Sequence, residues 1–260
     1  LVGSEMCIRD SNICMHNLQW NNVTIKYVIA GLVNGGSIVT TYWFFMPLYA
    51  AYLAIPLFSA VEKEKRKSVY VYISVVGFLL NVLIPFAAKF TDWVPYNPGF
   101  RLFVNMSYLF YVVVGWLLHT QEIKRKDRIV IYILAILGLF TNMIGTYFLS
   151  MRDGTVNKTF NGYNDVPCIL YAIGVFVLIK QIAPKIMDVK WIRAIVVYLN
   201  KYTFGVYLLH WSVLKAVIRL TRVNEVSLIW RLLSPIGIVA VCVAIIWVIR
   251  KIPVLKHVVP

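Results

Sequence analysis

Long apolar segments are the feature that most constrains how this chain folds. Seven of them approach the roughly 20 residues that cross the hydrocarbon core of a bilayer. A backbone in lipid must satisfy its own hydrogen bonds, which allows only helices or closed barrels, and these runs lack the alternation of barrel strands. The sequence therefore predicts an all-α, polytopic integral membrane helix bundle. The segments are Thr40–Val61, Val69–Phe90, Leu102–Leu118, Ile129–Leu149, Val166–Ile182, Thr203–Ile218 and Leu228–Ile249.

Composition excludes several other classes of protein. Hydrophobic residues make up 60% of the chain and charged residues 14%, against about 25% charged residues in soluble domains. A soluble fold of this size cannot bury that much apolar surface. The four cysteines are scattered, without a CxxC pair or a metal-ligand spacing, so neither a disulfide framework nor a metal site is expected.

Lysine and arginine alternate between the two sides of the predicted bundle. The connections after the first, third, fifth and seventh segments carry sixteen of them, and the opposite connections carry seven. Basic loops stay in the cytoplasm, so we expect a multi-pass protein of the cell membrane with a cytoplasmic C-terminus. The net charge of +15 is then an orientation signal beside anionic membrane lipids and does not indicate a nucleic-acid partner.

The N-terminal stretch LVGSEMCIRDS does not look like part of this bundle. It contains Glu5, Arg9 and Asp10 and no apolar core, so it is not a signal peptide, and it resembles a translated sequencing adapter. We expect residues 1–11 to be non-native, residues 12–251 to form a partial membrane domain, and residues 252–260 to form a cytoplasmic tail. The natural chain would then begin upstream, with an odd number of crossings before Thr40.

Polar side chains inside membrane segments are candidates for function, because burying them in lipid is costly. Thr203, Tyr207 and His210 are spaced i, i+4, i+7 in the sixth segment, so they share one helix face. An imidazole there can donate or accept a proton near neutral pH. The alternative is a structural histidine that is hydrogen-bonded to a neighbouring helix.

Other polar and aromatic residues allow two interpretations each. Asn142 and Asn81 either bind substrate or act as hydrogen-bonding contacts between helices, and Trp43 lies where aromatic residues anchor at the outer interface. The outer loop Ser150–Asp165 is either a plain loop or a platform whose aromatic rings stack on a sugar. The stretch Trp191–Asn200 is either a short interfacial helix or an extension of the sixth segment.

Two motifs carry a resemblance to a known family. LNKYTFGVYLLHWSVL (Leu199–Leu214) resembles the penultimate-helix signature of the membrane acyltransferase-3 family, in which a serine precedes a Y-x-I-Y-L-x-H run. TYWFFMPLYAAYLAIPL (Thr41–Leu57) is similar to the family's W-[FY]-L and LYL-x-x-P element. Met46 and Pro47 depart from that element, and Tyr202-Thr203 stands at the place of the serine, which leaves the subfamily open.

The resemblance implies a fold and an activity. Family members have roughly ten helices, of which about seven would be present here, and they move an acyl group, often acetyl from cytoplasmic acetyl-CoA. The acceptor is a cell-surface carbohydrate or its lipid-linked precursor. Acyl-CoA would be the donor substrate, and no bound cofactor is implied. Basic residues at the cytoplasmic side would attract its phosphates: Lys180, Lys185, Lys190, Arg193 and Lys201.

The resemblance also limits what this chain is expected to do. The family's catalytic arginine and histidine belong to the first helix and would lie upstream, so the catalytic residues are unassigned here and this fragment is expected to be inactive alone. His210 and Tyr207 match the Y-L-x-H positions and, with Thr203, Asn142 and Trp43, are the candidate substrate-binding residues. A histidine in this chemistry acts as a general base or accepts the acyl group itself.

A polytopic transporter or flippase for a lipid-linked sugar is the alternative function. Such proteins are built from inverted repeats with paired broken helices at the midplane. The chain has Pro47, Pro56 and Pro85 within its apolar segments but no repeat pairing. The upstream coding sequence would separate the two functions: a first helix with arginine and histidine favours acyl transfer, and a mirrored set of crossings favours transport.

Overall fold

A computed structural model describes residues 43–91, 97, 99–102, 104, 108–224 and 227–251. The expected non-native segment 1–11 and the expected tail 252–260 lie outside these residues. The chain divides into two compact units, one within residues 2–182 and the other within residues 183–260. Each is described by itself.

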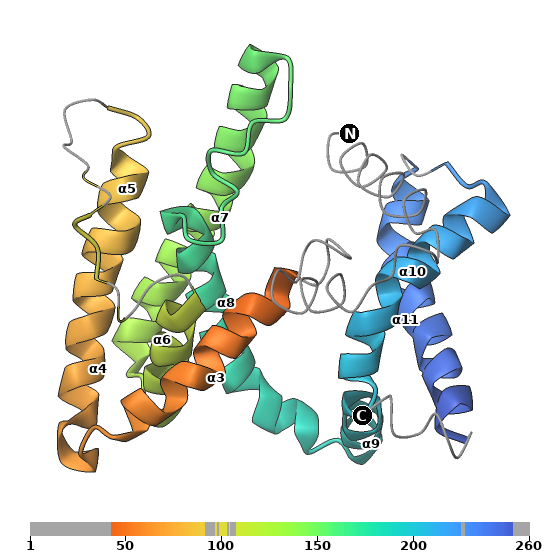
Figure 1. Cartoon of the computed structure of the whole chain (residues 1–260), viewed down its shortest axis with the longest axis horizontal. Helices are drawn as coiled ribbons and strands as arrows, with labels where there is room; N and C mark the ends of the chain where they lie inside the picture. The colour runs from red at the N-terminus through yellow and green to blue at the C-terminus, as the bar shows by residue number, and fades with distance from the viewer. Residues whose placement is uncertain are drawn as a thin grey trace, which may run out of the picture. The chain divides into compact units, whose positions relative to one another are not determined.

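Every regular element in the described ranges is a helix, as expected for an all-α membrane protein (Figure 1). The first unit contains α3 (Phe45–Ser59), α4 (Lys63–Phe78), a π-helical turn η4 (Leu79–Leu83), α5 (Ile84–Ala87), α6 (Tyr108–Thr120), α7 (Arg125–Asp153) and most of α8 (Val166–Met187). The second contains α9 (Lys190–Asn200), α10 (Thr203–Thr221) and α11 (Leu228–Lys251).

Four helical stretches in the described residues are long and apolar enough to cross a bilayer: Lys63–Ala87, α7, α8 and α11. The expectation of seven crossings stays a prediction for the other three segments. The apolar helices α3 and α6 have 15 and 13 residues, fewer than a full crossing needs. Helix α10 has 19 residues, but His210, Lys215 and Arg219 lower its mean hydropathy.

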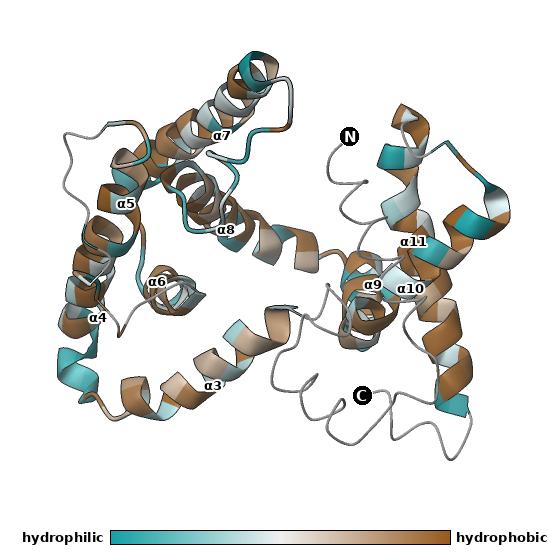
Figure 2. Cartoon of the chain, turned by 45° about the horizontal axis from the view of Figure 1, so that its top comes forward, coloured by the Kyte–Doolittle hydropathy of each residue, from teal (hydrophilic) through white to brown (hydrophobic). Residues whose placement is uncertain are grey.

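Most of the helical ribbon consists of hydrophobic residues (Figure 2), and many of the large apolar side chains are exposed. Leu53 and Leu57 of α3 are 78% and 75% exposed, and Leu220 of α10 is 83% exposed. In α7, only 6% of the most apolar 18-residue window is buried. Such surface is unfavourable in water but matches hydrocarbon, so these faces contact lipid and the chain is a multi-pass membrane protein.

Asn81 and Pro85 explain the π-helical turn in the second apolar segment. Pro85 has no backbone N–H and its ring crowds the carbonyl four residues earlier, which belongs to Asn81. The helix widens there into η4. The Asn81 side chain donates to the Leu102 carbonyl and accepts from the Leu102 N–H, both at 2.9 Å. Asn81 is therefore a structural contact to the chain before α6, one of the two roles expected for it.

Aromatic rings join α3, α4 and α6. Tyr70 is 5% exposed, its ring lies 4.8 Å from the Trp116 ring, and its hydroxyl donates to the Phe58 carbonyl at 2.9 Å. That bond satisfies a phenol that burial would otherwise leave without water. A second cluster joins η4, α6 and α8 through Val82, Phe110 and Ile169.

Glycines bring α7 and α8 into close contact. A Cβ added at Gly174 of α8 would lie 2.2 Å from the Ala135 Cβ of α7, and one added at Gly138 would lie 2.7 Å from the Pro167 carbonyl oxygen. Small residues of this kind let membrane helices approach until their backbones touch, where dispersion forces hold them together.

The stretch after α8 forms a helix of its own, which decides between the two interpretations of Trp191–Asn200. Helix α9 carries Lys190 and Arg193 on one face and Trp191, Ile195 and Leu199 on the other, and none of its residues is buried. This is the pattern of a helix that lies in the membrane interface. Lys201 and Tyr202 separate it from α10, which packs on α11 through Val213, Ile238 and Cys242.

Replacement of Gly174 by alanine is expected to destabilise the first unit. The new methyl would overlap Ala135, and overpacking of this kind costs about 1–3 kcal/mol. Thermal unfolding in detergent measures the loss. Gly115→Ala is the matched control, because a Cβ at Gly115 of α6 meets nothing within 4 Å. Equal melting temperatures for the two variants would contradict the close packing.

Candidate functional site

One ring nitrogen of His210, Nδ1, contacts backbone carbonyls of its own helix, α10. Its Nδ1 lies 2.7 Å from the Tyr207 carbonyl oxygen and 3.2 Å from that of Val206. A carbonyl can only accept, so Nδ1 carries the proton, and in the neutral ring Nε2 keeps a lone pair. The Tyr207 ring lies 5.9 Å from the imidazole ring. The contacts leave Nε2 as the ring nitrogen with a free acceptor position in that tautomer.

Thr203 lies on the same face of α10 as Tyr207 and His210, but its hydroxyl points away from them. Its Oγ1 lies 3.5 Å from the Leu199 carbonyl oxygen of α9, so its hydroxyl is directed back toward the helix corner. Tyr207 and His210 are brought together by one turn of α10, and Thr203 lies at the entrance of that helix. Lys215, one turn beyond His210, places its ammonium 4.6 Å from the centre of the Trp211 ring.

Arg250 stabilises the corner between α9 and α10. Its guanidinium donates to the Lys201 carbonyl at 2.8 Å and lies 4.9 Å from the centre of the Tyr202 ring. Tyr202 is 5% exposed, and its hydroxyl donates to that of Tyr198 at 3.1 Å. The last turn of α11 thereby supports the start of the helix that carries His210.

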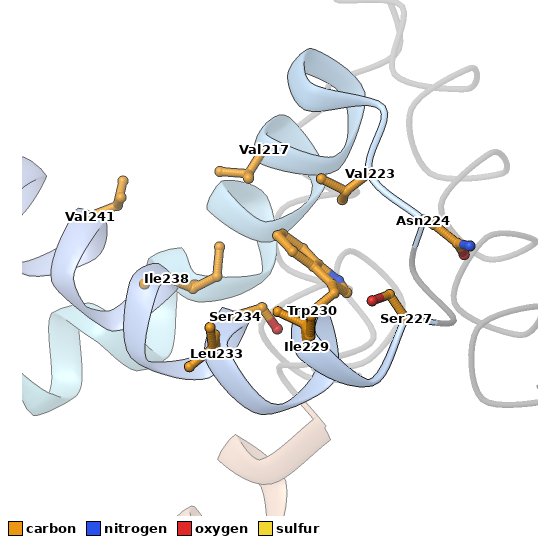
Figure 3. A pocket seen from close by; sticks show the side chains of 11 residues that line it. Val217, Val223, Asn224, Ser227, Ile229, Trp230, Leu233, Ser234, Ile238 and Val241 are labelled. Carbon is orange, nitrogen blue, oxygen red and sulfur yellow. The ribbon is translucent and has the colours of Figure 1, made fainter.

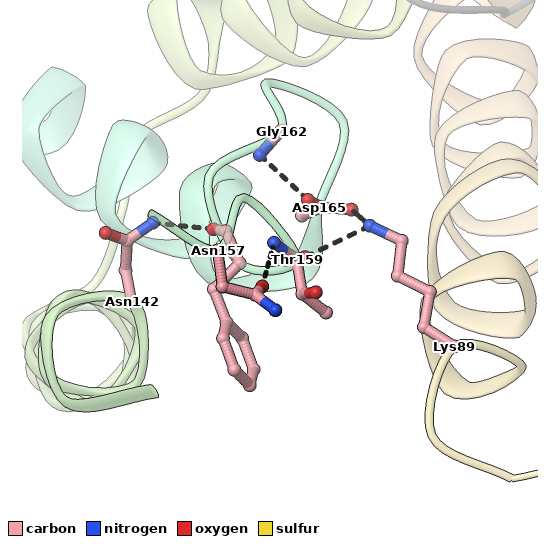
Figure 4. A network of polar contacts seen from close by, with 7 residues as sticks. Lys89, Asn142, Asn157, Thr159, Gly162 and Asp165 are labelled. Carbon is pink, nitrogen blue, oxygen red and sulfur yellow. Dashed lines mark hydrogen bonds and ion pairs between the residues drawn. The ribbon is translucent and has the colours of Figure 1, made fainter. Parts of the chain in front are cut away.

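Asn142 binds the loop between α7 and α8 (Figure 4). Its amide donates to the Phe160 carbonyl at 2.6 Å, and the Phe160 ring fits over Gly145, where a Cβ would come within 2.5 Å. The Phe160 ring also stacks on Phe90 at 5.3 Å. Phe160 therefore contributes to packing. Asn142 orders the loop in this structure, and a substrate role for it stays a prediction.

Lys89 and Asp165 form the centre of this loop. Asp165 is the one buried charged residue in the described part of the chain, 7% exposed. One carboxylate oxygen lies 2.5 Å from the Lys89 ammonium, and the other accepts from the Gly162 N–H at 2.8 Å. Lys89 also donates to the Thr159 carbonyl at 3.1 Å. The pair fastens the loop to the end of α5 and to the start of α8 (Figure 4).

Trp43 belongs to an aromatic group beside the same loop. Its ring stacks on Tyr163 at 5.5 Å and lies 5.8 Å from Tyr108. The hydroxyl of Tyr111 donates to the Tyr163 carbonyl. Trp43 and Tyr163 keep 38% and 58% of their surface exposed. A fixed pair of exposed rings of this kind can cover the apolar face of a sugar ring, and it can also anchor in the membrane interface.

Among the five basic residues expected to attract acyl-CoA, Lys180 has a structural role. Lys180 donates to the carbonyls of Leu118, His119 and Gln121 at 2.6–2.9 Å, which closes the C-terminal end of α6. Lys185, Lys190, Arg193 and Lys201 are exposed. The structure therefore separates Lys180 from the other cations that were expected to attract acyl-CoA.

Sequence reasoning missed the Lys89–Asp165 pair and the role of Arg250. A signal for the pair was present, because Asp165 directly precedes an apolar segment and Lys89 ends another segment on the same predicted side. An acid at a helix N-terminus is favourable. In the described ranges no group of three His, Cys, Asp or Glu side chains is arranged to hold a metal ion.

Replacement of Asp165 by asparagine is expected to lower the free energy of unfolding by about 1–3 kcal/mol, because it leaves the Lys89 ammonium without its partner. Asp153→Asn is the control: the Arg152 side chain of that pair is 71% exposed, so water screens the pair and the loss should be smaller than that of Asp165→Asn. Chemical unfolding in detergent compares them. A larger loss for the control would show that the loop depends on another contact.

Comparison with protein-family models matches residues 12–250 to the acyltransferase domain of the acyltransferase-3 family. Neither the curated proteins nor the solved structures that were searched contain a significant match. The matched region covers nearly the whole chain. The four helices that are long and apolar enough to cross a membrane agree with a membrane acyltransferase. The chain thus belongs to the acyltransferase-3 family of membrane acyltransferases.

Proposed function

We propose that this protein takes part in the transfer of an acetyl group from acyl-CoA to a hydroxyl of a cell-surface or lipid-linked carbohydrate. Membership of the family supports acyl transfer over the transport of a lipid-linked sugar. The observation that carries the proposed chemistry is the Nδ1 contact of His210, because it leaves Nε2 as a proton acceptor.

The reaction requires a base and an electrophile. The acceptor hydroxyl loses its proton to Nε2 of His210 as its oxygen attacks the thioester carbonyl, and coenzyme A leaves as a thiol after protonation. Tyr207 presents its ring next to the imidazole and lines the acceptor side. As the family resemblance implies, an arginine and a histidine of the family's first helix are expected to take part in the reaction as well.

The donor and the acceptor approach different parts of the protein. The exposed cations of α9 and its neighbours attract the phosphates of acyl-CoA from the cytoplasm, the side on which we place the C-terminus in the cell membrane. The exposed rings of Trp43 and Tyr163 are proposed to hold a carbohydrate on the opposite side, with Asn142 as a further contact. Thr203 is proposed as a separate substrate contact at the start of α10.

Replacement of His210 by alanine is expected to reduce acetyl transfer by about 10²–10⁴-fold, the usual contribution of a general base. The assay joins the chain to its upstream coding sequence and follows labelled acetyl from acetyl-CoA to a membrane carbohydrate. His119→Ala, at the end of α6, is the matched control and should keep full activity. Equal activities for both variants would remove His210 from the reaction.

Charge reversal on α9 tests the donor side. Lys190→Glu combined with Arg193→Glu should raise KM for acetyl-CoA by about tenfold, leave kcat unchanged, and make KM less sensitive to salt, because long-range attraction is screened. Lys124→Glu combined with Lys126→Glu provides a control at the start of α7. The same rise in KM for both pairs would indicate a general surface charge effect.

A further inference from the structure

Helix α9 has an apolar face that the described residues leave exposed. Trp191, Ile195 and Leu199 follow one another at intervals of four residues, so they share one side of the helix. They keep 66%, 49% and 41% of their surface exposed, and none of the residues of α9 is buried. A contiguous face of this kind is unfavourable in water and indicates a partner.

The apolar groove between α10 and α11 is of a different kind (Figure 3). It encloses about 560 Å³, and none of the described residues that line it is charged. Its lining therefore does not select between a lipid chain, a side chain of the protein and a small apolar molecule. Helix α9 distinguishes among partners, because it carries charges of its own.

Basic side chains occupy the side of α9 opposite to the apolar face. Lys190 and Arg193 lie at its start, and Lys201 follows its last residue in helical conformation. Val197 is four residues from Arg193 and four from Lys201, so it lies in the middle of this basic face. All four residues are exposed. Within the part of the chain that the structure describes, no carboxylate forms an ion pair with these three cations.

One acidic residue accompanies the cations. Asp188 lies in the short connection before α9, and Lys185 precedes it in the last turn of α8. The stretch 185–201 contains these two residues and the three cations of the basic face, so four basic residues and one acid give a net charge of +3. The acid weakens the positive charge without reversing it. The partner of α9 is therefore expected to be apolar on one side and anionic on the other.

The chain connection to α8 places α9 at the surface of the bilayer. Helix α8 is long and apolar enough to cross the membrane, and it ends at Met187, three positions before Lys190. Three residues of extended chain reach at most about 11 Å, and the headgroup layer on each side of the hydrocarbon core is roughly 5–7 Å thick. Acyl chains and headgroups are thus both within reach of α9 where α8 ends.

We propose that α9 binds the surface of the leaflet on the predicted cytoplasmic side and that it prefers anionic phospholipids there. Its apolar face lies among the acyl chains, as in other helices of the membrane interface. Its lysine and arginine side chains are long enough to reach the headgroup phosphates from the opposite face. This binding is independent of the proposed acyl transfer, because it requires neither acyl-CoA nor an acceptor.

Two positions of α9 test the orientation of the helix. Ile195 on the apolar face is 49% exposed and Val197 on the basic face is 52% exposed, so the described protein shields them equally. In nanodiscs of phosphatidylglycerol and phosphatidylcholine, a membrane-impermeant maleimide should label Val197→Cys at least about tenfold faster than Ile195→Cys, because a thiol among acyl chains forms little thiolate. Both variants also carry Cys7→Ser and Cys14→Ser, and the two remaining cysteines are buried.

The fluorescence of Trp191 tests which lipid is bound. The Trp191 signal is the difference between the chain and its Trp191→Phe variant, and one of the two lipids carries brominated acyl chains, which quench nearby indoles. Brominated phosphatidylglycerol should reach half-maximal quenching at a mole fraction about fivefold below that of brominated phosphatidylcholine, given the attraction of each basic residue near a membrane. Lys190→Gln combined with Arg193→Gln should abolish this difference. Lys124→Gln combined with Lys126→Gln, around the start of α7, should preserve it.

Equal labelling rates of the two cysteine variants would overturn the proposal, because the apolar face would then be in water. Slow labelling of Ile195→Cys without quenching of Trp191 by either lipid would also overturn it, since another segment of protein would then cover the face. Equal half-maximal mole fractions for the two lipids would contradict the preference for anionic lipids. All of the substitutions in α9 alter exposed side chains, and no measurement involves acetyl transfer, so a failure here leaves the proposed function unaffected.

Discussion

The cost of a backbone polar group without a partner beside lipid governs much of this structure. Helix ends leave carbonyls that no residue of the same helix can satisfy, and water is scarce near the hydrocarbon core. Long cationic side chains supply the donors: Arg66 donates to Ser59 and Val61 at the end of α3, and Lys180 donates to three carbonyls at the end of α6. Basic residues that count toward the predicted orientation thus also close helix ends.

The same constraint connects the fold with the proposed chemistry. Asn81 and Asn142 satisfy backbone groups outside the helices, whereas His210 directs Nδ1 to carbonyls inside its own helix that also accept helical N–H groups. The imidazole differs from the amides because a second nitrogen remains, and that nitrogen is a base. The contact is made to carbonyls of α10 itself, whereas the structural interpretation expected a neighbouring helix, and the chemical role of His210 stays a prediction.

The sequence was sufficient for the class of fold and for the family, because hydropathy over 20 residues and a short motif are local signals. It was less informative where separate segments meet. The partner of Asn142 is a carbonyl of the following loop, and the partner of Asp165 is Lys89, 76 positions away in the chain. Periodicity does not encode such pairs. The short α6 and the polar α10 also show that the length of an apolar run in the sequence does not determine the length of the helix that forms or its ability to cross a membrane.

Arg250 ties the last turn of α11 to the corner that separates α9 from α10. The helices α9 and α10 are thereby coupled through a side chain of α11. Movement of α9 with its surrounding headgroups would be transmitted to the inclination of the neighbouring helix and hence to the depth of its imidazole. Bilayer thickness and headgroup composition would in this way affect the role proposed for His210.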